Sequence, residues 1–109
     1  MNKNINNSLL QYIRDDEYTS FVECCEYYIN VDIEYKNYEL VFKNSFVNAC
    51  LYNRLEFVKY LLQKYNLMNI VSKIAIRQIF PYSKYLCKIN NYNEILVLLN
   101  NQTNIVLYE

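Results

Sequence analysis

Residues 44–69 of the chain carry two helical patterns that are separated by a short polar turn. The first pattern is short and consists of Phe46, Ala49 and Cys50. The second is clearer, because apolar side chains recur every three or four residues, at Leu55, Val58, Leu61, Leu62 and Tyr65. A helix pair of this unequal kind cannot bury its apolar faces alone, so it indicates a protein built from stacked repeats.

Two weaker versions of this pattern flank the central pair. Helical spacing covers residues 8–30 on both sides of an acidic turn, and residues 82–100 on both sides of an Asn-rich turn. The sequence therefore predicts an all-α, single-domain fold, a short solenoid of about three stacked helix–turn–helix units near residues 8–30, 45–67 and 82–100.

The segments that connect these units are less regular. Apolar and polar residues alternate from Val31 to Lys36, so we expect a non-helical, hairpin-like connection over residues 31–43. Residues 70–80 fit either a short helix or an irregular connection, because their β-branched side chains oppose helix propensity. Pro81 suits the first position of the helix that follows.

The central turn needs a special backbone conformation. A tight turn between two helices usually contains a residue with a positive φ angle, for which glycine is the commonest choice. The chain contains no glycine, and asparagine is the best substitute. We therefore expect Asn53 to adopt a positive φ angle.

The composition narrows the class of protein. The chain has 109 residues and is 53% hydrophobic, which is too apolar for a disordered protein. No apolar run is long enough to span a bilayer, and the polar amino terminus lacks the apolar core of a signal peptide. We therefore expect a cytoplasmic protein without a membrane partner.

The charges give no electrostatic case for a nucleic-acid partner, because 11 basic and 11 acidic residues cancel to a net charge of zero. Acidic residues gather early in the chain and basic residues later. In a stack this distribution would produce a dipole that orients a partner or a second copy, whereas two ordinary solvated surfaces are the alternative.

Catalytic and metal-binding chemistry is not indicated. The chain has no histidine and no glycine, so it lacks the commonest general base, the commonest zinc ligand and any glycine-rich phosphate loop. The acidic run Asp15–Asp16–Glu17 is typical of a solvated turn. The four cysteines form no Cys-x-x-Cys pair, and we expect them to pack as small apolar side chains: Cys24, Cys25, Cys50 and Cys87.

The central unit resembles an ankyrin repeat in the order and spacing of its residues. Asn44–Ser45–Phe46 stands where that family has Thr-Pro-Leu, and Ala49–Cys50 where it has paired alanines. Asn53–Arg54–Leu55–Glu56 matches the family's Gly-His-Leu-Glu turn, and Phe57 to Leu62 matches its second helix. With its Asn- and Ile-rich composition, the chain is similar to ankyrin proteins of giant DNA viruses.

The outer units match the family less closely. In the third unit Cys87 stands for the alanine and Asn91 for the glycine, and in the first unit Asp16 takes the turn position. The spacing from Glu56 to Glu94 exceeds the family's period of about 33 residues, so we expect an insertion between residues 69 and 83.

The resemblance implies a binding module that takes a host or viral protein on its concave face, without catalytic residues or cofactors. The partner-binding residues that it implies lie at the outward ends of the first helices and on the hairpin: Leu51, Tyr52, Ile89, Asn90, Leu40, Val41 and Lys43. A structural helical protein that associates with its own copies, and has no separate partner, is the alternative interpretation.

Overall fold

The computed structural model describes residues 2–31 and 35–102, with side chains described over 7–27 and 38–102. These residues form helices without any strand, so the all-α prediction is confirmed. The helices are α1 (Asn2–Arg14), α2 (Tyr18–Val31), α3 (Tyr35–Leu51), α4 (Leu55–Asn66), α5 (Ile70–Ile76), α6 (Ile79–Ile89) and α7 (Asn93–Asn100).

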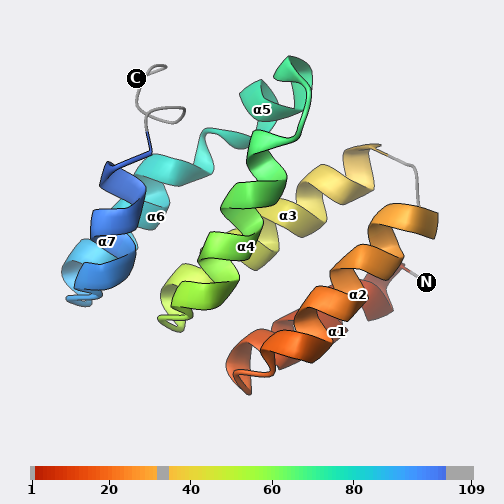
Figure 1. Ribbon diagram of the computed structural model, residues 1–109, viewed down its shortest axis with the longest axis horizontal. Helices are drawn as coiled ribbons and strands as arrows, with labels where there is room; N and C mark the ends of the chain where they lie inside the picture. Colours follow the sequence, from red (N-terminus) through yellow and green to blue (C-terminus); the bar gives the residue numbers. More distant parts are fainter. Residues whose placement is uncertain (1, 32–34, 103–109) are drawn as a thin grey trace.

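Six of the helices form three antiparallel pairs arranged in two layers. The pairs are α1–α2, α3–α4 and α6–α7, and they lie side by side across the molecule (Figure 1). Helix α3 contacts α1 on one side and α6 on the other, and α4 contacts α2 and α7 in the same way. The extents of 34 × 32 × 18 Å agree with this arrangement, because two layers of helices are roughly 20 Å thick.

The three pairs share one turn geometry. Asp16, Asn53 and Asn91 have φ angles of 58°, 60° and 60°, and the residue after each donates its N–H to a carbonyl five residues earlier. For example, Arg54 N lies 2.8 Å from Ala49 O, while Asn53 N lies 3.2 Å from Cys50 O. This is the hydrogen-bond pattern of a Schellman motif, which ends one helix and starts the next. The positive φ expected at Asn53 is confirmed.

In the second-helix layer formed by α2, α4 and α7, the number of buried flanks of a helix depends on whether its pair is central or outer. The central helix α4 is buried on both flanks, through Phe57 and Leu61 toward α2 and through Val58 and Leu62 toward α7. The outer helices bury one flank each. The buried residues are Phe21 and Cys25 in α2, and Ile95 and Leu99 in α7.

The connection predicted over residues 31–43 is wrong, because α3 already begins at Tyr35. Alternation ends near Lys36, and from Tyr38 onward the apolar positions have helical spacing. Val41 and Phe42 are adjacent in sequence and both buried, which fits a helix and not the period-two pattern that predicted a strand. Residues 32–34 lie outside the described part of the chain.

The segment between the second and third pairs is helical. Asn69 caps α5 by accepting a hydrogen bond from Ser72 N at 2.9 Å. Pro81 is the third residue of α6 and not the first as predicted. It still lies in the first turn, where a missing N–H removes no bond within the helix. Among the described residues, no helix is long and apolar enough to cross a membrane.

Candidate protein-binding surface

The common turn geometry puts the first helices in register. Residues at equal distances before Asp16, Asn53 and Asn91 occupy equivalent positions on α1, α3 and α6. Three such rows point away from the second-helix layer, and none of their side chains is buried. We call this surface the first-helix face. Its rows are Asn7, Asn44 and Tyr82; Leu10, Val47 and Tyr85; and Arg14, Leu51 and Ile89.

The character of the first-helix face changes from α1 to α6. The α1 column is polar and cationic at Asn7 and Arg14, whereas the α6 column is apolar throughout. Tyr82, Tyr85 and Ile89 are 54%, 57% and 54% exposed. The sequence interpretation included Ile89 but missed both tyrosines. Their spacing of three and four residues along one helix was the available signal.

The predicted residues at the ends of the first helices lie on or beside this face. Leu51 and Ile89 share its last row, and Tyr52 and Asn90 follow them at the start of the turns. Leu51 is 42% exposed and Tyr52 is 36% exposed. These side chains are accessible to a partner, although each is also partly covered by its own helix pair.

The predicted hairpin residues are placed differently. Leu40, Val41 and Lys43 belong to helix α3, so no hairpin carries them. Leu40 is exposed and Lys43 is half-buried. Val41 is only 5% exposed and lines a cavity between α3 and the first pair, so its side chain is part of the core and does not reach the surface.

A shallow groove of about 190 Å³ runs between α1 and α3 on the first-helix face. Its walls include Asn7, Leu10, Asn44 and Asn48, so amide groups alternate with apolar surface. Asn48 Nδ2 donates to Asn44 O at 2.7 Å. Such a groove has donors and acceptors suited to a peptide backbone.

Arg54 joins the first two pairs at the turn edge of this face. Its Nε and Nη2 donate to Ile13 O and Arg14 O, both at 2.7 Å, and its Nε lies 3.9 Å from an Asp16 carboxylate oxygen. These carbonyls belong to the last turn of α1 and have no acceptor role within that helix. Arg54 therefore caps α1 from the neighbouring turn.

A second polar link joins α2 to α4. The Glu26 carboxylate accepts a hydrogen bond from the Tyr60 hydroxyl, and Lys64 Nζ lies 2.6 Å from the same oxygen. The hydrogen bonds from Lys64 and Tyr60 lower the pKa of Glu26. Burial and the Glu26 carboxylate raise the pKa of Tyr60.

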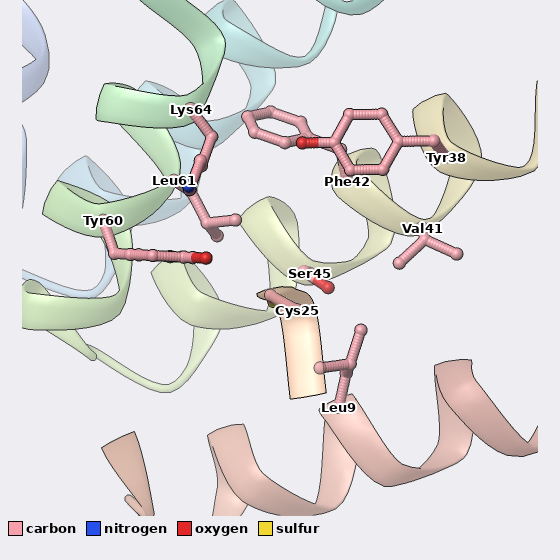
Figure 2. A pocket seen from close by; sticks show the side chains of 9 residues that line it. All are labelled: Leu9, Cys25, Tyr38, Val41, Phe42, Ser45, Tyr60, Leu61 and Lys64. Carbon is pink, nitrogen blue, oxygen red and sulfur yellow. The ribbon is translucent and has the colours of Figure 1, made fainter. Parts of the chain in front are cut away.

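The cavity between the first two pairs is a gap in the core rather than a ligand site. Figure 2 shows Leu9, Val41, Phe42 and Leu61 around it, with Tyr60 and Lys64 at one side. Its volume of about 20 Å³ is roughly the space that one water molecule needs. Burial raises the pKa of Tyr38, which also lines it, to about 12.

All four cysteines are free thiols; Cys25, Cys50 and Cys87 are buried, as the sequence suggested, whereas Cys24 is only partly buried. A hydrogen bond between the Cys50 and Cys87 side chains, together with burial, raises the pKa of Cys50. The same bond lowers the pKa of Cys87. Burial raises the pKa of Cys25, which keeps that thiol unreactive. Over residues 2–31 and 35–102, no group of three or more Cys, Asp or Glu side chains is placed to hold a metal ion.

Comparison of the chain with protein-family models, with curated proteins and with solved structures found no match.

Proposed function

We propose that this protein is a short ankyrin-like solenoid whose function is protein–protein recognition in the cytoplasm of an infected host cell. The observation that carries the proposal is the repeated unit. Three helix pairs lie side by side in two layers, and each has a residue with a positive φ angle at the same position of its turn. Stacked units of this kind form rigid, extended surfaces that other proteins bind. The ankyrin-like order of residues in the central unit supports the proposed family, and that order together with the Asn- and Ile-rich composition supports the proposed viral origin.

The outer pairs also suit a stack. The α3 positions that bury Phe46 and Cys50 against the third pair are occupied in α6 by Lys84 and Lys88. Likewise, the position of buried Leu62 in α4 is occupied in α7 by exposed Asn100. Polar residues at the open side of an end unit are typical of repeat proteins, because that unit lacks one neighbour.

The first-helix face is the surface that we assign to the partner. It combines accessible aromatic and aliphatic side chains with a groove of amide groups, and it is mounted on helices that are fixed by Arg54 and by the core. Tyrosine is favoured at such surfaces because it adds a large contact area at low cost in side-chain entropy. Tyr52 lies at the edge of the central pair, with a neighbouring pair on each side.

The test is affinity capture with the immobilised protein from infected-cell extract. Tyr52→Ala should lose the captured protein, with binding weaker by about 30-fold, which corresponds to about 2 kcal/mol. The matched control is Tyr27→Ala, because Tyr27 is an exposed tyrosine on α2, in the other layer. Both variants should keep the melting temperature of the wild type. If Tyr52→Ala and Tyr82→Ala both capture the same protein as the wild type, the first-helix face is not the binding surface.

Self-association is the second candidate, and the exposed α6 column of the first-helix face favours it. A second copy that covers Tyr82, Tyr85 and Ile89 would remove this apolar surface from water. Sedimentation velocity separates the two candidates. A sedimentation coefficient that rises with concentration, and does not rise for Tyr85→Ala, supports self-association.

A further inference from the structure

Helix α5, together with Leu67 at the end of α4, exposes apolar side chains to solvent. These are Leu67, Ile70, Val71 and Ile74, which we call the α5 patch, and they are 81%, 54%, 71% and 48% exposed. Ile70, Val71 and Ile74 have the spacing of one face of α5, and an apolar helix face normally packs on the core of a globular protein. Here the core contacts are made by the opposite face, through Ser72 and Ile76.

The patch is held firmly at one edge of the molecule. Figure 1 shows α5 beyond the end of α4, at the edge opposite the three turns. Asn69 caps the helix, α5 packs on α3, and Ile76 is fully buried. The four aliphatic side chains therefore form a fixed projection, and not a hollow that a side chain from another protein could fill.

Basic residues predominate in the stretch of sequence that carries the patch. Between Phe57 and Asn93 the sequence has no acidic residue and six basic ones: Lys59, Lys64, Lys73, Arg77, Lys84 and Lys88. Lys73 and Arg77 belong to α5 and its C-cap, so they are the nearest cations. Lys73 Nζ lies 5.7 Å from the centre of the Tyr65 ring, a cation–π contact.

We propose that the α5 patch is a peripheral contact for an anionic lipid surface. Projecting aliphatic side chains beside Lys and Arg suit the boundary between acyl chains and acidic headgroups. Residues that bind a protein partner strongly are more often Trp, Tyr or Arg than aliphatic residues such as Leu and Val. The inference differs from the expectation of no membrane partner, because that expectation considered only spanning segments.

Binding to lipid through the α5 patch is compatible with the proposed function, and the lipid proposal does not depend on that function. The α5 patch and the turn edge with Leu51, Tyr52 and Ile89 are at opposite edges of the molecule (Figure 1). A protein bound to lipid through α5 would keep its turn edge directed away from the surface. Lipid binding and protein capture can therefore be tested independently.

The chain contains no tryptophan, so single-tryptophan variants report local burial without background. We would compare Val71→Trp with Val97→Trp, because Val97 is a similarly exposed valine on α7. The probes are vesicles of phosphatidylcholine, alone and with about 30% phosphatidylserine. The emission of Val71→Trp should shift to shorter wavelength with the anionic vesicles only, and the emission of Val97→Trp should not shift.

Co-sedimentation of the wild-type protein with the same vesicles provides a second measurement. The pelleted fraction should fall about tenfold or more in Val71→Asp and remain unchanged in Val97→Asp. Raising the salt from about 0.1 M to about 1 M should weaken wild-type binding, because it screens Lys73 and Arg77. Both aspartates replace exposed side chains, and equal melting temperatures would verify folding.

Three results would overturn the proposal. One is the same spectral shift in both tryptophan variants, and another is equal binding to neutral and anionic vesicles. The third is a wild-type dimer in sedimentation velocity that Val71→Asp converts to monomer, because a second copy would then cover the α5 patch. Loss of vesicle binding would leave the capture experiment with Tyr52 unaffected.

Discussion

Three residues with left-handed backbone angles form the turns of the three helix pairs. Asp16, Asn53 and Asn91 replace the glycine that such turns usually contain, and each allows the next residue to bond back into the preceding helix. Asparagine and aspartate tolerate this conformation better than other residues with a Cβ atom, because their short polar side chains bond locally. A single residue therefore sets the direction of each second helix.

This role predicts different outcomes for two substitutions at Asn53. Asn53→Ala should destabilise the protein by about 1 kcal/mol, because alanine is strained at positive φ, and should lower the melting temperature by about 4–8 °C. Asn53→Gly should stay within about 0.5 kcal/mol of the wild type. Thermal denaturation followed by circular dichroism measures both. Equal melting temperatures for the two variants would contradict the argument.

Because of Glu26, the free energy of unfolding should decrease as the pH falls into the acidic range. The pKa of Glu26 is lowered in the folded protein by hydrogen bonds from Lys64 and Tyr60, so its contribution is complete above the unfolded pKa of about 4.3. The contribution disappears as pH falls through the lower, folded pKa. Because the carboxylate is partly exposed, it amounts to less than about 1 kcal/mol.

The measurement compares melting temperatures of the wild type and Glu26→Gln. At about pH 6 the wild type should be the more stable, and at about pH 3 the difference should vanish. Glu23→Gln is the control, because Glu23 is an exposed carboxylate on the same helix. A wild-type advantage that persists at low pH would show that the carboxylate charge is not responsible.

At the scale of elements, α4 is the second-layer helix that is buried on both flanks. Its buried residues are Phe57, Val58, Tyr60, Leu61, Leu62 and Tyr65, and they face both neighbouring pairs. Toward α2 the contact is aromatic, with the ring centroids of Phe21 and Phe57 4.8 Å apart and those of Tyr18 and Phe57 5.4 Å apart. Toward α7 the equivalent positions hold aliphatic side chains, Ile95 and Leu98.

The burial of α4 predicts a large effect for Leu61→Ala. Leu61 is 3% exposed and lies against the first pair, beside the core cavity. Truncation should cost about 2–5 kcal/mol, a large part of the total stability of a domain, and should lower the melting temperature by about 10 °C or more. Val97→Ala is the control and should stay within about 0.5 kcal/mol, because Val97 is exposed. An unchanged transition for Leu61→Ala would contradict the packing of α4.

At the scale of the whole molecule, the order of the three helix pairs separates acidic from basic residues. The acidic residues Asp15, Asp16, Glu17 and Glu23 belong to the first pair, whereas Lys84 and Lys88 belong to the last. The unequal distribution along the sequence therefore becomes a separation in space, since the first and last pairs lie on opposite sides of the central one (Figure 1). If the first-helix face binds a charged partner, as we propose, this separation of charge would orient that partner.

Periodicity alone determined the helical class, the three turns and much of the core. Leu55–Tyr65 is a helix because its apolar positions repeat at helical spacing, and Asn53 has a positive φ because the turn requires it. Helical spacing and turn conformation depend on residues close together in the sequence, so they can be predicted without knowing the tertiary contacts. The ends of the first helices, Leu51 and Ile89, were proposed on a different basis, the resemblance of the central unit to an ankyrin repeat.

Only the tertiary structure decided which apolar residues are covered. Val41 and Ile70 are both β-branched aliphatic residues on helices. Val41 is buried because α3 has a helix on each side, whereas Ile70 is exposed because it lies on the outer face of α5. Arg54 likewise acquires its role from carbonyls of residues 13 and 14, about 40 positions away. Burial and capping across pairs depend on contacts between distant segments, which local spacing does not contain.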